Sequence, residues 1–137
     1  EGGTPVLLND RWNGSPAISP DGKFVAVWHA EMYADQWKLA LIPLNSGGKP
    51  VRTFSATFSA NWPTGPIRWT ADGLGLLYIV TADGVSNIWR QPMDGGKPVP
   101  VTQFQNDLIF SFDISPDGKT LVCERGTTAQ DVILLSE

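Results

Sequence analysis

Few side chains in this sequence could perform acid–base or nucleophilic chemistry, and they do not cluster. The chain has one histidine, His29, and one cysteine, Cys123, and it has no Gly-x-Ser-x-Gly segment that would carry a nucleophilic serine. A metal site usually needs several His, Cys or carboxylate ligands close together, and the sequence shows no such cluster. We expect a structural or solvent-facing role for His29 and a place in a strand core for Cys123. The sequence therefore predicts no enzyme active site, no bound metal and no cofactor.

The most regularly spaced carboxylates belong to a repeat. The segment 19–23, Ser-Pro-Asp-Gly-Lys, recurs at 115–119, and a weaker copy, Thr-Ala-Asp-Gly-Leu, occupies 70–74. The Asp residues of these copies, Asp21, Asp72 and Asp117, are 51 and 45 residues apart. Pro presets φ for a turn, Asp caps the turn locally, and Gly accepts a positive φ. We therefore interpret the three Asp residues as turn residues and not as calcium ligands.

A second marker repeats with nearly the same period. Gly-Gly followed by x-Pro-Val occurs at 2–6, 47–51 and 95–99, so its copies are 45 and 48 residues apart. A period of about 45 residues is the length of a four-stranded β-propeller blade. No stretch has a convincing period of about 3.6 residues, so we expect minimal helix.

Each repeat predicts four short strands, A to D, joined by turns. Strand A is predicted at 16–19, 67–70 and 112–115, strand B at 24–29, 76–80 and 120–124, strand C at 39–44, 87–93 and 131–135, and strand D at 51–54 and 99–104. The sequence thus predicts an all-β propeller domain spanning 1–137, with three four-stranded blades at about 15–54, 65–104 and 111–137.

The repeated turns carry a family resemblance. The Ser-Pro-Asp-Gly-Lys turn and the later Gly-Gly turn resemble those of the TolB-type, WD-like propeller repeats of bacterial proteins, over essentially the whole chain. The last blade, through 107–113 and 131–135, resembles propellers attached to bacterial serine/threonine kinases. This resemblance implies protein partners or a sensor role, and a periplasmic or extracytoplasmic location. The middle turn departs from the pattern, with Ala71 in place of Pro and Leu74 in place of Lys.

Three blades are too few for a ring, because propellers typically have about 4–8. A second copy of the sequence placed after Glu137 keeps the repeat in register. We therefore expect a homodimer that forms a six-bladed ring, in which residues 4–8 of one chain add a strand to the third blade of the other. Val6 to Leu8 would pair with Asp131 to Leu135 of the second copy. A trimer would satisfy the same edges with more blades than usual.

Two groups of residues are candidate binding sites. The B–C and D–A loops hold Trp12, Tyr33, Trp62 and Arg125, which could form a binding face because aromatic side chains often anchor interfaces. The alternative is that these aromatics pack under their own loops. Strand A lines the central channel of a propeller, and its equivalent positions are Ala17, Arg68 and Asp113. Arg68 and Asp113 could present charge to a channel ligand, but an ion pair between adjacent blades is favoured.

Charge and hydropathy argue against several classes of function. The net charge is −4, and the ten Lys and Arg residues are spread along the chain, which argues against a nucleic-acid partner or an anionic membrane surface. No stretch approaches the roughly 18 apolar residues of a membrane-spanning helix, and no signal segment starts the sequence. The sequence favours a non-catalytic scaffold for protein–protein interaction. The alternatives are a small-molecule or peptide binder at the channel mouth, and an excised or designed half-propeller with no function of its own.

Overall fold

The computed structural model describes residues 5, 7–8, 12–30, 37–45, 47–55 and 65–128, with only the backbone of Trp12. Within these ranges the chain forms β-strands and no helix, as the sequence predicts. It follows that the described part has no helix able to cross a membrane. The predicted strand at 131–135 and the residue Val6 lie outside the described residues.

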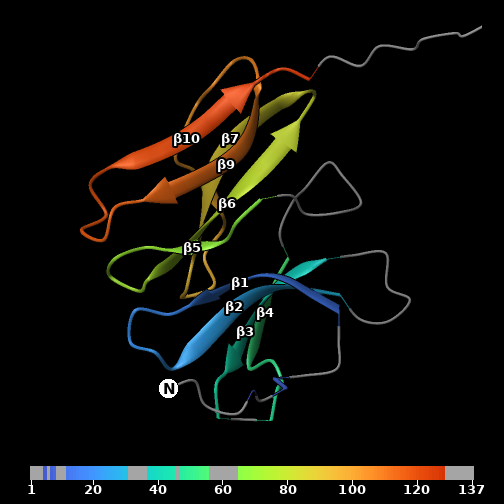
Figure 1. Ribbon diagram of the computed structural model, residues 1–137, viewed down its shortest axis with the longest axis vertical. Helices are drawn as coiled ribbons and strands as arrows, with labels where there is room; N and C mark the ends of the chain where they lie inside the picture. Colours follow the sequence, from blue (N-terminus) through green and yellow to red (C-terminus); the bar gives the residue numbers. More distant parts are fainter. Residues whose placement is uncertain are drawn as a thin grey trace, which may run out of the picture.

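The strands form three antiparallel sheets that follow one another along the long axis of the molecule (Figure 1). The first sheet has the order β1-β2-β3-β4, with strands Trp12–Ile18, Phe24–Ala30, Lys38–Pro43 and Arg52–Phe54. The second sheet has the order β5-β6-β7-β8, with strands Arg68–Trp69, Gly75–Ala82, Val85–Pro92 and Val99–Pro100. The third sheet pairs β9, Leu108–Ile114, with β10, Leu121–Gly126. Two of the sheets are thus four-stranded meanders, and the described strands do not close into a ring.

Three predicted strand boundaries lie four residues from the observed ones, and the others in the described part of the chain differ by at most two residues. β1 begins at Trp12 instead of residue 16, and β9 begins at Leu108 instead of residue 112, because both pair with nearly the full length of the following strand. β8 ends at Pro100 instead of residue 104. Proline has no N–H to donate to a ladder. Beyond it, the N–H groups of Val101 and Thr102 both donate to the single carbonyl of Ile88, and Phe104 bonds to the side chain of Asn87.

The alternating faces of β6 hold the sheets together. Leu76 and Tyr78 pack with Trp28 of the first sheet in one core cluster, where the Trp28 and Tyr78 rings meet edge to face at 5.5 Å. Burial raises the pKa of Tyr78 to about 12, so the phenol stays neutral. Leu77 and Ile79, on the opposite face of β6, pack against the third sheet. The second sheet is therefore covered on both faces.

The outward faces of the first and third sheets differ. Val25, Val27, Ala40 and Ile42 form a buried cluster on the first sheet, and Leu8 of the same chain packs against it. On the third sheet, Phe110 and Val122 remain 42% and 65% exposed. Leu7 and Leu8 lie in no strand of this chain, so the proposed pairing of residues 6–8 with a second copy stays a prediction.

Candidate functional site

The three Asp–Gly turns share one hydrogen-bond pattern. In the first turn, Ser19 Oγ donates to Asp21 Oδ1 at 2.6 Å and the Lys23 N–H donates to the same oxygen at 3.1 Å. The third turn repeats both bonds at the same lengths around Asp117. In the middle turn Thr70 and the Leu74 N–H donate to Asp72 Oδ1 at 2.5 and 2.8 Å. In each turn the hydrogen bond from the hydroxyl is the main cause that lowers the pKa of the Asp carboxyl, and the bond from the backbone N–H lowers it further.

These bonds confirm that the three Asp residues act as turn acceptors. The glycine that follows each Asp has a positive φ, +69° at Gly22, +69° at Gly73 and +71° at Gly118, which L side chains rarely adopt. The middle turn keeps this geometry even though Ala71 and Leu74 replace Pro and Lys. Those two replacements therefore do not change the shape of the turn.

The inner strands of all three sheets line one groove of about 430 Å³. Ala17 of β1, Arg68 of β5 and Asp113 of β9 all contribute to its wall, so the structure brings together the three predicted channel residues. The Arg68 Nε donates to Asp113 Oδ1 at 2.8 Å. This bond, above all, lowers the pKa of Asp113. Of the two alternatives left open by the sequence, the ion pair between adjacent sheets is the one formed.

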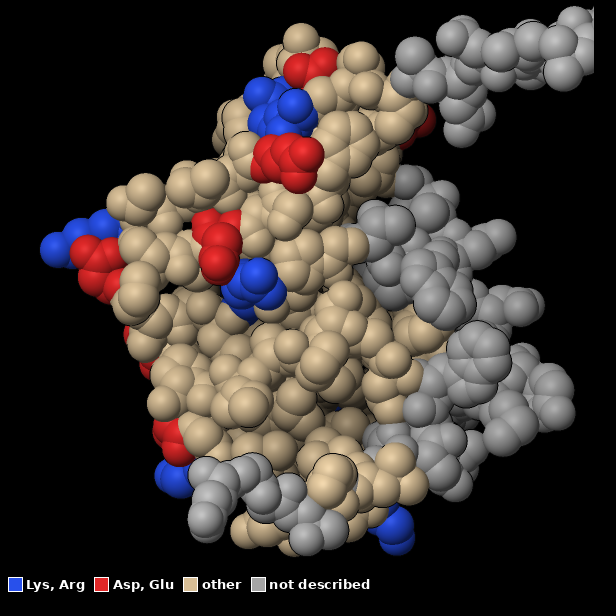
Figure 2. Space-filling model, in the orientation of Figure 1, with Lys and Arg blue, Asp and Glu red and all other residues tan. Residues whose placement is uncertain are grey.

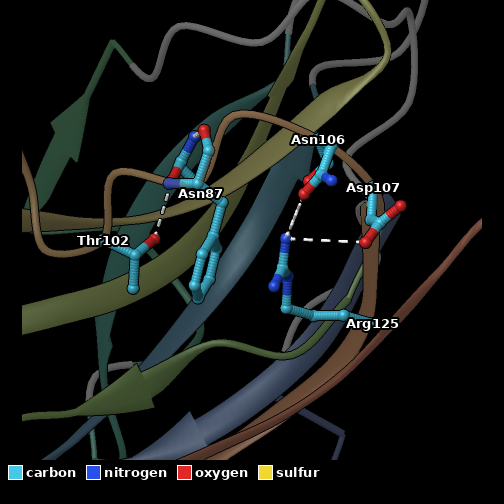
Figure 3. Close-up of polar contacts among 6 residues, drawn as sticks. Asn87, Thr102, Asn106, Asp107 and Arg125 are labelled. Atoms are coloured by element: carbon cyan, nitrogen blue, oxygen red, sulfur yellow. Dashed lines mark hydrogen bonds and ion pairs between the residues drawn. The ribbon is translucent and has the colours of Figure 1, made fainter.

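Arg125 lies in an internal contact. Its guanidinium stacks over the Phe104 ring, with 3.6 Å between Cζ and the ring centroid. Its Nη2 donates to the backbone O of Asn106 at 2.7 Å and lies 3.8 Å from Asp107 Oδ2 (Figure 3). The Arg125 side chain is only 26% exposed. The cation therefore ties β10 to the segment that precedes β9, and most of its surface faces the protein, which leaves little of it for a partner.

Asn87 is a residue whose role sequence reasoning missed. Its Oδ1 accepts from the Phe104 N–H at 2.7 Å and from Thr102 Oγ1 at 2.9 Å, and its Nδ2 donates to the Phe104 carbonyl at 3.2 Å (Figure 3). The side chain thus bonds to both backbone groups of Phe104, a residue that follows β8 and lies in no strand. The only signal in the sequence is that a carboxamide stands beside Ile88 in a predicted C strand.

The other predicted residues fall into two groups. The side chains of Trp12, Tyr33 and Trp62 lie outside the described residues, so the binding face remains a prediction. His29 is buried, with Nδ1 3.0 Å from Asn13 Oδ1 across the β1–β2 pair, which is a structural position. Cys123 packs against the core between the second and third sheets, as predicted.

Charge is distributed in small mixed groups on the face shown in Figure 2, where acidic and basic side chains lie next to one another. Two of the measured ion pairs are of this kind, Lys23 with Asp21 at 3.5 Å and Arg68 with Asp113 at 2.8 Å. Within the described ranges, no three His, Cys, Asp or Glu residues are grouped so that they could hold a metal ion. This geometry offers recognition of shape and local charge.

Comparison with known proteins places this geometry among solved folds. No protein-family model matches the chain, and no curated protein matches it. A solved structure of a TolB-like protein from Agrobacterium tumefaciens matches with a TM-score of 0.60 and 25% sequence identity. The match covers 80% of this chain and 36% of that chain, so this sequence spans about a third of its structural neighbour. Together, the repeated Asp–Gly turns, the four-stranded meanders and this match support a relationship between this chain and the TolB-like propeller proteins.

Proposed function

We propose that the chain is a non-catalytic propeller scaffold for protein–protein interaction. The observation that carries this proposal is the joining of the sheets by continuous cores on both faces of β6, which gives a firm support for the turns and loops at their ends. Binding residues are often carried by loops on such a support. The TolB-like match supports the same class of function.

The test is capture of a partner followed by reconstitution. Chemical crosslinking of the full chain identifies candidate proteins, and calorimetry with each purified candidate measures its affinity. Alanine at Trp12, Tyr33 and Trp62 together should weaken binding if these aromatics form the binding face. Saturable binding of a purified protein supports the scaffold, whereas finding no partner that binds after purification contradicts it.

The assembly that we propose for this scaffold is a homodimer closing a six-bladed ring. Its support is the β9–β10 face turned away from the second sheet, where the apolar side chains Phe110 and Val122 are exposed. Sheet faces of propeller blades are stabilised by packing on a neighbouring blade. Sedimentation equilibrium at micromolar concentration should give the dimer mass, and Val122→Lys should shift it toward the monomer. A monomer at these concentrations contradicts the ring, and a trimer mass supports the larger alternative.

A second candidate function is small-molecule or peptide binding at the groove between the inner strands. The groove of about 430 Å³ favours it, but its facing charges, Arg68 and Asp113, already satisfy each other. Arg68→Gln should then reduce ligand binding without affecting binding of a protein at the loops.

A further inference from the structure

A second groove lies between the first and the middle Asp–Gly turns, at the end of the second sheet opposite the β6–β7 turn. Its volume is about 350 Å³, and we call it the turn groove. Its apolar lining comes from both sheets and consists of Phe24, Leu41, Trp69, Leu74 and Met93. The groove is therefore formed only when the first and second sheets pack together.

Leu74 is the departure from the repeat that makes this groove apolar. The other two turns carry Lys23 and Lys119 at this position, and Leu74 is 61% exposed. The turn uses only the backbone of Leu74, whose carbonyl accepts from the Met93 N–H at 3.0 Å and from Arg90 Nη2 at 3.1 Å. Since lysine supports the same turn twice, folding of the turn does not require this exposed leucine.

Trp69 is a second departure on the same wall. The equivalent strand positions hold Ile18 and Ile114, whereas Trp69 places an indole beside the groove. Its Nε1 donates to the Ala17 carbonyl at 2.9 Å, which fixes the plane of the ring. The aromatic wall is therefore positioned before any partner arrives.

The residues that line the turn groove carry two formal charges, and both are negative. These are Asp21 and Asp72, whose Oδ1 atoms are held by their own turns. Asp21 also has an exposed ion pair with Lys23 at 3.5 Å, of a kind that contributes little to stability. Asp72 forms no ion pair in the described part of the chain, although the positive charge of Arg90, which donates to the Leu74 carbonyl, acts on it and helps to lower its pKa. An apolar groove with carboxylates at its rim is complementary to a long basic side chain.

We propose that the turn groove binds a basic segment of a protein partner. The methylene groups of an arginine or lysine side chain would lie along Trp69 and Leu74, and its charged end would reach Asp72 and Asp21. Basic side chains bury their stems on apolar surface while the charge stays at the rim, and a guanidinium stacks well on an indole. This inference rests on the proposed scaffold function and adds the chemistry of the partner.

The experiment is a nuclear magnetic resonance titration of the ¹⁵N-labelled full chain with two synthetic peptides. The probe is acetyl-Gly-Arg-Leu-Gly-amide, and the charge-reversed control is acetyl-Gly-Glu-Leu-Gly-amide. We expect the basic peptide to shift the Trp69 indole N–H and the amides of Gly73 and Leu74. Leu74→Lys and Asp72→Asn should each weaken its affinity by about three- to fivefold, the size of a lost surface ion pair or equivalent contact.

The sister turn supplies matched controls. Asp117→Asn removes the same carboxylate charge from a turn that does not line the groove, so it should leave the affinity for the basic peptide unchanged. Leu74→Lys introduces the residue that the other turns already carry, so its fold should be intact, and a superimposable spectrum elsewhere checks this.

Three outcomes overturn the inference. These are equal shifts with the acidic peptide, an affinity unaffected by Leu74→Lys, and no response of the three signals. Such a result leaves protein capture by the scaffold untouched, and failure to find a protein partner does not alter the peptide titration, so the two proposals can fail separately.

Discussion

The two junctions between neighbouring sheets use different interactions although one repeat builds both. Between the first and second sheets, the large rings of Trp28 and Tyr78 meet in the core, and Arg52 Nη1 donates to the Met93 carbonyl at the rim. Between the second and third sheets the core is mainly aliphatic, and polar contacts are added. The Ser86 N–H donates to the Asp107 carbonyl at 3.0 Å, and Arg125 stacks on Phe104.

This difference shows what the repeat specifies and what it leaves free. The Asp–Gly turns are nearly identical in all three copies, whereas the residues that join one sheet to the next are not. Each junction is therefore held by its own set of contacts. Substitutions that act on one junction should reveal whether the two unfold as one unit.

The largest effect is expected from Trp28→Ala at the first junction. Trp28 is almost fully buried, so its loss removes apolar contacts and leaves a cavity, which should lower the free energy of unfolding by about 3–5 kcal/mol. Urea unfolding followed by circular dichroism measures the change. Val51→Ala, at an exposed position outside the proposed interfaces, is the control and should change stability by no more than about 0.5 kcal/mol. A small effect of Trp28→Ala would mean that the first junction is not held by its aromatic core.

A smaller effect is expected from Asn87→Ala at the second junction. The substitution leaves the Phe104 N–H and carbonyl without their side-chain partner, which should cost about 1–3 kcal/mol. It should also increase hydrogen exchange at Phe104 far more than at Tyr78. Gln103→Ala, at an exposed neighbouring position, should alter neither quantity. If exchange at Phe104 is unchanged, Asn87 does not organise this segment.

Acidification should weaken all three Asp–Gly turns together, because each turn depends on an ionised Asp. It therefore tests the feature that is common to all three sheets. The pKa values of Asp21, Asp72 and Asp117 lie below their ordinary value of 3.8 in the folded chain. Their contribution is therefore fully present above that value and is lost as the pH falls through the folded pKa values. Replacing the three Asp residues with Asn keeps an acceptor oxygen and should flatten the acid-side decline in melting temperature. An unchanged decline would show that other carboxylates control acid stability.

The smallest effect is expected at the ion pair that joins β5 to β9. The Asp113 side chain is 70% exposed, so solvent and salt screen its attraction to Arg68. Asp113→Asn should leave the urea midpoint almost unchanged, and a double-mutant cycle with Arg68→Gln should give a coupling near the error of measurement. A large coupling would place this pair among the interactions that hold the second junction.

The local features of this protein follow from the sequence alone. A turn of the Ser-Pro-Asp-Gly-Lys type is held by bonds between residues two to five positions apart, so its residue types predict its shape directly. The two turn markers together predicted the B strands and the order of strands in both meanders. They also predicted that Arg68 and Asp113, 45 residues apart, would occupy matching places.

Three other contacts between distant segments were decided only by the tertiary structure. The segment after β8 is bonded at Phe104 to the side chain of Asn87, 17 residues earlier in the chain. The place of Arg125 depends on the packing of β10 against the segment before β9. In the sequence, Leu74 is only a departure from the lysine of the other two turns. Its place in a groove follows from the first sheet, which supplies the opposite wall. Turn chemistry is local and can be deduced from neighbouring residues, whereas these contacts exist only when separate sheets bring their side chains together.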